Sequence, residues 1–199
     1  MSWDIIFEDD LKRQGSVLAA FAGCLVQNWY FAYKLQQYLP KDKACRILEA
    51  GAGTGYLAFY LSSLGHDVVA MDIDTDFMEK ANSALRSNVS ILRQDIRTYP
   101  YASPSFDLIY NIGVMEHFFD EDIIRIFKNF RSVSDMLIFA VPNFNIPYSY
   151  GDERYLSRRH WKRLLRLAGW RTKEIFGYNR RILRKYLTGF VCIGDNQVI

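Results

Sequence analysis

Cysteine and histidine are scarce in this chain. Only three cysteines occur in 199 residues, Cys24, Cys45 and Cys192, and none belongs to a CxxC pair. Cys45 and Cys192 lie in strand-like apolar runs, so we expect buried, reduced thiols rather than a disulfide framework. The three histidines do not fit a zinc site with ordinary ligand spacing. The sequence therefore predicts neither a disulfide scaffold nor a zinc cluster.

Long hydrophobic runs and a basic leader are also lacking. No apolar stretch reaches the roughly 18–20 residues that a membrane span needs. The first ten residues hold four acids and no base, unlike a secretory signal. We therefore expect a cytoplasmic protein without a membrane span. The length predicts a single domain over 1–199, with an N-terminal helical cap (1–42), a cofactor-binding core (43–143) and a C-terminal, substrate-side region (144–199).

Charge is unevenly distributed along the chain. Residues 1–149 carry 13 Lys/Arg and 18 Asp/Glu, whereas residues 150–199 carry 12 and 4. A basic C-terminal quarter is typical of a surface that faces an anionic substrate, nucleic acid or lipid, and equally of a solvated helix face. Composition alone leaves these alternatives open.

Short apolar runs alternate with helix-like segments through most of the chain. We expect strands at 45–50, 67–71, 89–93, 106–111 and 136–141, and helices at 16–38, 55–64, 75–86 and 120–130. A last helix at 158–167 precedes two strand-like runs, 170–176 and 190–194, with little room between them for a crossover helix. The pattern predicts an α/β fold: a doubly wound, mostly parallel, seven-stranded Rossmann-like sheet with an antiparallel edge strand and helices on both faces.

A glycine-rich turn connects the first expected strand to the helix that follows. It runs from Glu49 to Gly55 and reads EAGAGTG. Glycines let the backbone turn sharply and let a ligand approach closely, while the helix N-terminus behind them offers unpaired N–H groups. Dinucleotide-binding turns prefer GxGxxG, which needs glycine at the position of Tyr56. The spacing found here therefore disfavours an NAD-dependent oxidoreductase.

From Arg46 to about Asn143 the chain resembles the class I S-adenosylmethionine-dependent methyltransferase superfamily. The resemblance rests on the glycine turn and on acids at the ends of the next two strands, and it implies S-adenosyl-L-methionine as cofactor. It implies that Asp72 accepts the ribose hydroxyls and that Asp95 meets the adenine amino group. The full set of implied cofactor-binding residues is Glu49, Ala50, Gly51, Gly53, Gly55, Asp72, Ile73, Asp95, Ile96 and Asn111.

The stretch FDLIYNIGVMEHF (106–118) is similar to strand four and its following loop in many small-molecule methyltransferases. The resemblance places Asn111 beside the sulfonium end of the cofactor. His117 is the candidate catalytic base, although a Glu-His pair at this position is also typical of a loop-fixing role. Quinone-pathway O-methyltransferases that bind magnesium here carry a glutamate where this chain has Gly113, so we expect no metal.

The resemblance is best to enzymes that methylate an oxygen or nitrogen of a small molecule (EC 2.1.1) by in-line displacement. Strand four lacks the Pro-Pro-aromatic motif of amino-methylating DNA enzymes, and the paired glutamates of arginine methyltransferases are missing. Two alternatives stay open: an RNA or protein methyltransferase that uses the basic C-terminal region, and a non-catalytic binding module. Nucleic acid is the less favoured partner.

Residues outside the core are the candidates for a substrate lid. If the C-terminal bases bind the acceptor, an anionic acceptor is favoured. The spacing of Trp29 and Tyr33, four apart on one helix, favours core packing over a lid. His160 and Trp161 are expected in the helix that covers the sheet. The lid candidates are Trp29, Tyr30, Tyr33, Tyr148, Tyr150, Arg180, Arg181, Arg184 and Lys185.

Overall fold

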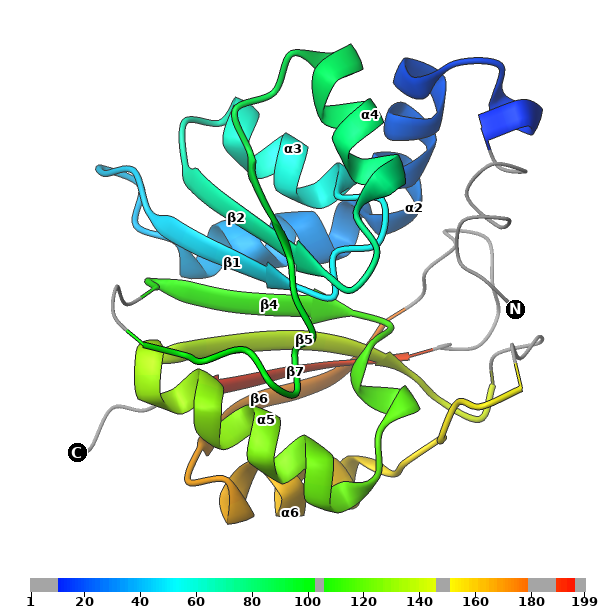
Figure 1. The fold of residues 1–199 in the computed structure, drawn as a ribbon. Coiled ribbons are helices and arrows are strands. Elements are labelled where there is room, and N and C mark those ends of the chain that lie inside the picture. The colour runs from blue at the N-terminus through cyan, green and yellow to red at the C-terminus, as the bar shows by residue number, and fades with distance from the viewer. Residues whose placement is uncertain (1–10, 103–105, 146–150, 179–188, 196–199) are drawn as a thin grey trace. The chain divides into compact units, whose positions relative to one another are not determined.

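The computed structural model describes residues 11–102, 106–145, 151–178 and 189–195. The chain divides into two compact units, residues 1–96 and residues 97–199. Each unit has its own set of paired strands and its own helices (Figure 1). Among the described residues, no helix combines the length and the hydropathy that crossing a bilayer requires.

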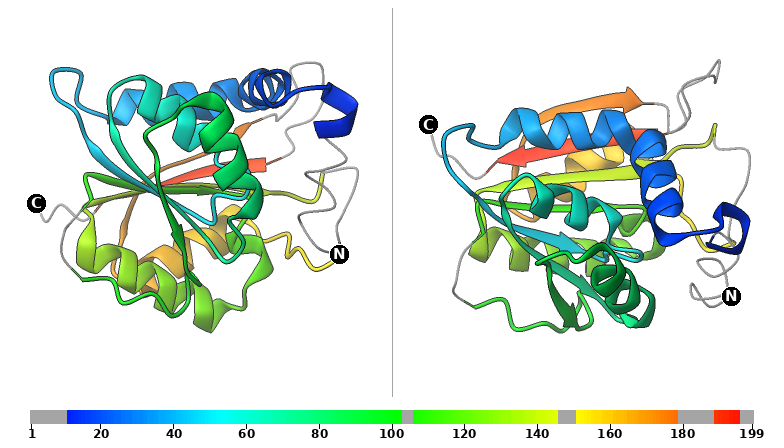
Figure 2. Two further views of the ribbon diagram at one scale, coloured as in Figure 1. Left: turned by 45° about the horizontal axis from the view of Figure 1, so that its top comes forward. Right: turned by 90° about the horizontal axis from the view of Figure 1, so that it is seen from above.

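The first unit is a parallel three-stranded sheet whose strands pair in the order β3-β2-β1. Its helices contact one another on one face of these strands (Figure 2). The elements are α2 (Val17–Tyr38), β1 (Arg46–Ala50), α3 (Tyr56–Ser63), β2 (Asp67–Asp72), α4 (Asp76–Leu85) and β3 (Ser90–Arg93). As predicted, α2 begins after Ser16, because the Ser16 hydroxyl accepts the Ala19 N–H at 3.2 Å.

Buried apolar side chains fix where the strands of the first unit end. Ile47, Leu48 and Met71 are fully buried, and burying one such side chain contributes about 1.5–3 kcal/mol. Ala50 is paired with Met71, so the chain leaves β1 and β2 at the same edge of the sheet. The glycine turn and Asp72 therefore emerge side by side.

The second unit has the strand order β4-β5-β7-β6. β4 and β5 are parallel. β7 lies between β5 and β6 and is antiparallel to both. The predicted antiparallel pair of the last two strands, β6 and β7, is thereby confirmed. Helices α5 and α6 pack together on one face (Figure 1). The elements are β4 (Leu108–Ile112), η1 (Met115–His117), α5 (Asp120–Val133), β5 (Met136–Pro142), α6 (Arg158–Leu167), β6 (Arg171–Tyr178) and β7 (Gly189–Asp195).

Aromatic side chains form the core of the second unit. Tyr110, Phe127, Phe139 and Trp161 are fully buried, and the rings of Phe139 and Trp161 lie 5.3 Å apart in an edge-on arrangement. Trp161 therefore belongs to the helix that covers the strands, as predicted. The fourth strand begins later than the expected 106, because Phe106 makes only an isolated bridge to Ser134.

Two expectations about burial have different outcomes. Cys45 and Cys192 are buried free thiols, as predicted, and burial raises the pKa of the Cys192 thiol. The expected core packing of Trp29 and Tyr33 is wrong, since both side chains are about half exposed. The face of α2 that packs in the first unit is the one carrying Phe31 and its neighbours, so the face with Trp29 and Tyr33 is turned to solvent.

Candidate functional site

The glycine turn of the first unit has a left-handed backbone conformation at each of its three glycines. Gly51, Gly53 and Gly55 all have positive φ, at 79°, 53° and 70°, a region that side chains disfavour. The turn is tied to the neighbouring strand, because the N–H groups of Gly51 and Ala52 both donate to the carbonyl of Met71 at 2.8 and 2.9 Å. The backbone thus approaches the end of β2 without any Cβ at three positions.

Asp72, the last residue of β2, is hydrogen-bonded to this turn. One carboxylate oxygen accepts the Gly53 N–H at 2.7 Å, and the other accepts the Asp74 N–H at 3.2 Å. Burial raises the pKa of Asp72, and the backbone hydrogen bonds from Gly53 and Asp74 oppose that rise. A carboxylate has about four acceptor positions, so both oxygens retain capacity for the hydroxyl groups of a ligand.

Glu49 is buried in β1, and its side chain caps the N-terminus of α3. Its carboxylate accepts the Ala58 N–H at 3.0 Å. Gly55, at the N-cap of α3, has no side chain to do this, so Glu49 satisfies one of the otherwise unpaired N–H groups of the helix. The structure thus gives Glu49 a helix-capping role, and its predicted contact with a cofactor stays a prediction.

The remaining predicted residues of the first unit gather at the same edge of the sheet. Ile73 follows Asp72 and is largely exposed, Asp95 follows β3 and is partly exposed, and Ile96 is buried. The Gln94 N–H donates to the Asp72 carbonyl at 2.9 Å, which ties the segment after β3 to the end of β2. Ligands of open parallel sheets bind at this carboxyl edge.

Asn111, in β4 of the second unit, is a buried amide with unmet hydrogen-bonding capacity. Neither its oxygen nor its nitrogen makes a hydrogen bond to the part of the chain that the structure describes. Leaving a buried donor or acceptor unpaired costs about 1–3 kcal/mol. An amide in this state at the end of a strand is well suited to a bound polar group.

His117, the candidate base, lies in η1 and contacts a residue far along the chain. Its Nδ1 is 3.0 Å from a carboxylate oxygen of Asp152. The Arg154 N–H donates to the Glu116 carbonyl at 2.9 Å, so the segment containing Asp152 is fastened to the Glu-His pair. These contacts agree with the loop-fixing alternative, and the catalytic role of His117 stays a prediction.

Asp120, the first residue of α5, joins the same polar cluster. It accepts from an Arg154 guanidinium nitrogen at 2.7 Å and lies 2.7 Å from His160 Nε2. Burial tends to raise the pKa of Asp120, but hydrogen bonds from Arg154 and His160 outweigh it and the pKa is lowered. Sequence reasoning missed Asp152 and Arg154, because neither belongs to a motif. The lid candidates Tyr148, Tyr150, Arg180, Arg181, Arg184 and Lys185 lie outside the described residues.

Comparison with known proteins identifies the kind of domain. Residues 47–135 match the family model described as a methyltransferase domain. The chain is 27% identical over 146 residues to a probable S-adenosylmethionine-dependent methyltransferase of Mycobacterium tuberculosis, an alignment that covers 70% of this chain and 52% of that protein. The chain thus spans about half the length of the curated relative that it matches.

Solved structures show the same fold over both units. The 1,6-didemethyltoxoflavin-N1-methyltransferase of Burkholderia thailandensis is 16% identical, with a TM-score of 0.69 over 95% of this chain and 84% of that one. The magnesium protoporphyrin IX methyltransferase of Synechocystis PCC 6803, solved with bound SAH, is also 16% identical, with a TM-score of 0.68 over 87% and 85%. These likenesses confirm the predicted Rossmann-like α/β fold with seven strands.

The matched methyltransferase domain begins in β1, contains the glycine turn and Asp72, and extends through β4 to the end of α5. The predicted cofactor, S-adenosylmethionine, is borne out by these comparisons: the Mycobacterium tuberculosis relative is named as dependent on it, and the Synechocystis enzyme has been solved with it and with SAH. The predicted resemblance to the class I S-adenosylmethionine-dependent methyltransferase superfamily is confirmed.

Proposed function

We propose that this chain transfers a methyl group to an oxygen or nitrogen of a small-molecule acceptor. The observation that carries the proposal is the Asp72 carboxylate, held 2.7 Å from the Gly53 N–H at the edge where the glycine turn leaves β1. When bound, S-adenosylmethionine supplies an electrophilic methyl group on its sulfonium. The protein then has to hold the partners in line and exclude water.

The residues of the first unit suit the adenosine part of such a cofactor. The oxygens of Asp72 retain acceptor capacity for the two ribose hydroxyls. The exposed side chain of Ile73 offers an apolar wall for the base, next to Asp95 and Ile96 after β3. The three glycines of the turn leave room for the methionine part, and Glu49 caps the helix start behind them.

Two residues of the second unit have proposed roles in the transfer itself. The buried amide of Asn111, unpaired within the described chain, would be satisfied by a polar group of the cofactor's methionine end or of the acceptor. His117 would take a proton from an acceptor hydroxyl; Asp152, 3.0 Å from Nδ1, would favour the tautomer with the proton on Nδ1 and the acceptor lone pair on Nε2. A neutral amine acceptor would not need this base.

The small-molecule acceptor is supported by the likeness to two enzymes whose names state small substrates, a toxoflavin precursor and a magnesium porphyrin. An RNA or protein acceptor is the alternative that the basic C-terminal quarter favours. We further propose that the whole chain works as one methyltransferase domain, with an anionic acceptor preferred.

Incubation with methyl-labelled S-adenosylmethionine and mixed acceptors tests this function. We expect label in small anionic or aromatic acceptors, with loss of transfer in Asp72→Ala and near-normal transfer in Asp74→Ala, the adjacent acid. Label found in RNA or protein would replace the small-molecule proposal with its alternative. Tight cofactor binding without transfer to any acceptor class would favour the non-catalytic module.

A further inference from the structure

A buried hydroxyl fixes the end of the loop between β2 and α4. Thr75, the N-cap residue of α4, has no exposed surface. Its hydroxyl donates to a carboxylate oxygen of Glu79 at 2.7 Å and accepts the Nε–H of Arg93 at 3.0 Å. The direction of both hydrogen bonds is determined, because an ionised carboxylate cannot donate and a guanidinium cannot accept. Arg93 thus supplies the donor to this buried oxygen.

Arg93 reaches the loop from the neighbouring strand. It is the last residue of β3, and its register partner in β2 is Asp72. A second guanidinium nitrogen of Arg93 donates to the carboxylate of Asp76 in the first turn of α4. The guanidinium is a rigid, planar fork of donors, so two partners fix its orientation as well as its position. Arg93 thereby connects the end of β3 to the start of α4.

The loop that Arg93 holds is short and internally hydrogen-bonded. The Asp74 N–H donates to an Asp72 carboxylate oxygen at 3.2 Å, and the Asp76 N–H donates to an Asp74 carboxylate oxygen at 3.2 Å. Ile73 lies within this loop, and its side chain is 65% exposed. The position of the Ile73 side chain therefore depends on where the start of α4 is held.

Two segments leave the carboxyl edge of the strands next to each other, and Arg93 connects them. One is the loop that carries Ile73, and the other follows β3 and carries Asp95. Where they begin, the Gln94 N–H donates to the Asp72 carbonyl at 2.9 Å. A single connection of this kind acts as a hinge, whereas the second one, through Arg93, also fixes the spacing of the segments.

We propose that Arg93 is a positioning residue that sets the width of the slot for the adenine ring of the cofactor. The proposal rests on the proposed placement of the adenosine part at this edge, with Ile73 and Asp95 on either side of the base. Arg93 acts through these two segments rather than by contact with the cofactor. With the spacing fixed, the Asp95 carboxylate is held where it can accept from the adenine amino group.

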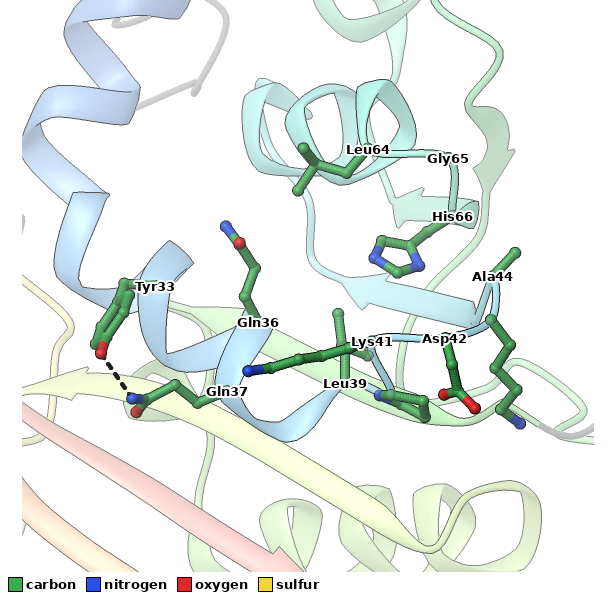
Figure 3. Close-up of a pocket in the computed structure, with 12 residues that line it drawn as sticks. Tyr33, Gln36, Gln37, Leu39, Lys41, Asp42, Ala44, Leu64, Gly65 and His66 are labelled. Atoms are coloured by element: carbon green, nitrogen blue, oxygen red, sulfur yellow. Dashed lines mark hydrogen bonds between the residues drawn. The ribbon is translucent and has the colours of Figure 1, made fainter.

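The opposite edge of the same strands supplies a matched control. The parallel strands β1 and β2 begin there, beside a hollow of about 800 Å³ that Lys41 lines (Figure 3). Their first residues, Arg46 and Asp67, form an ion pair at 3.7 Å. These side chains are 41% and 59% exposed, close to the 52% and 67% of Arg93 and Asp76. Loss of either arginine therefore removes an ion pair of similar exposure from the first unit.

Calorimetric titration of S-adenosylhomocysteine into the full chain is the first test. Arg93→Gln should raise the Kd about tenfold, because it frees the two segments from each other. Thr75→Val removes the other partner of the same hydrogen bond, so it should raise the Kd as well, and combining it with Arg93→Gln should add little. Arg46→Gln and Lys41→Gln should leave the Kd within about twofold of that of the unmodified chain.

The preference for adenine over a related base is the second test. S-inosylhomocysteine carries a carbonyl oxygen in place of the adenine amino group, and a carboxylate cannot accept a hydrogen bond from it. The unmodified chain should therefore bind the adenosine form more tightly, and Arg93→Gln should reduce this preference at least about threefold. The preference is a ratio of two dissociation constants, so partial unfolding of a variant weakens both equally and leaves the ratio unchanged.

The outcomes distinguish this proposal from the placement on which it rests. If Asp72→Ala binds S-adenosylhomocysteine like the unmodified chain, or the unmodified chain does not prefer adenine, the placement fails and the role of Arg93 fails with it. If Asp72→Ala loses binding while Arg93→Gln keeps the affinity and the preference, only the role of Arg93 is refuted. Equal losses in Arg93→Gln and Arg46→Gln, or weaker binding with an unchanged preference, also refute it.

Discussion

Replacing Gly55 by alanine should destabilise the first unit by two separable effects. Gly55 has φ +70°, and an added Cβ would lie 2.7 Å from Cγ and 2.9 Å from Sδ of Met78. The left-handed backbone costs a non-glycine residue about 1–2 kcal/mol. Crowding a packed core adds about 1–3 kcal/mol, and Met78 is fully buried, so it has little room to move away. The free energy of unfolding should therefore fall by about 2–5 kcal/mol.

Gly65 provides the matched control for this prediction. It has φ +92°, but an added Cβ would meet nothing within 4 Å. Gly65→Ala should therefore show only the backbone cost, about 1–2 kcal/mol. The difference between the two variants, measured by urea unfolding followed by circular dichroism, isolates the crowding against Met78.

A double-mutant cycle checks the assignment. Met78→Ala removes the side chain that the new methyl group would contact. The losses in unfolding free energy of the two single variants, Met78→Ala and Gly55→Ala, should therefore sum to more than the loss in the double variant. Equal destabilisation by Gly55→Ala and Gly65→Ala, or strict additivity of Gly55→Ala with Met78→Ala, would refute this account of the turn.

Three further sites give testable predictions: Glu49, Asp72 and the Arg171–Asp195 pair. Glu49→Ala should lower the free energy of unfolding by about 1–3 kcal/mol, because it leaves the buried Ala58 N–H unpaired; Glu49→Gln, which keeps an acceptor, should cost less in the same urea titration. Burial raises the pKa of Asp72 above its ordinary 3.8, so the charge that accepts ribose hydroxyls should be lost at a higher pH than for an exposed aspartate. The Kd of S-adenosylhomocysteine should then rise as pH falls toward that pKa, and a flat profile would contradict the assigned role. The same raised pKa means that the stability contributed by the protonated Asp72 carboxyl is present below pH 3.8 and is lost as pH rises through the raised pKa. Arg171 donates to both oxygens of the buried Asp195 at 2.7 and 2.8 Å, and these hydrogen bonds lower the pKa of Asp195 below 3.8. The stability that this ion pair contributes is present above pH 3.8 and is lost as pH falls through the lowered pKa of Asp195. Arg171→Gln should therefore reduce Tm at neutral pH and make the decrease of Tm in acid less steep. Thermal melts at a series of pH values measure both effects.

The positions of most elements could be predicted because local patterns determine them. Helix α6 has the predicted bounds Arg158–Leu167, since its serine N-cap and following glycine are both readable in the sequence. The buried strands β1 and β2 stand out as apolar runs that end at the glycine turn and at Asp72. The motif at that edge could therefore be placed from the amino-acid sequence alone.

Contacts between distant residues could not be predicted in the same way. His117 and Asp152 are 35 positions apart, and no periodicity connects a 3-10 turn to an irregular segment. Glu49 caps a helix from a neighbouring strand, whereas capping patterns consider only residues adjacent to the helix start. For Trp29 and Tyr33, spacing shows that they share a side of α2 but not what covers that side.

Calorimetric titration of S-adenosylhomocysteine into the folded chain tests the assigned cofactor site most directly. In the proposed site Asp72 accepts two charged hydrogen bonds from the ribose hydroxyls, each about 1.5–3 kcal/mol, so Asp72→Ala should weaken binding by about 10²–10⁴-fold. Asp74→Ala should bind nearly as well as the unmodified chain, because the Asp74 carboxylate accepts the Asp76 N–H at the start of α4. Binding near the micromolar range that only Asp72→Ala loses is the predicted result. Failure of the folded chain to bind, or equal losses in the two variants, would contradict the site.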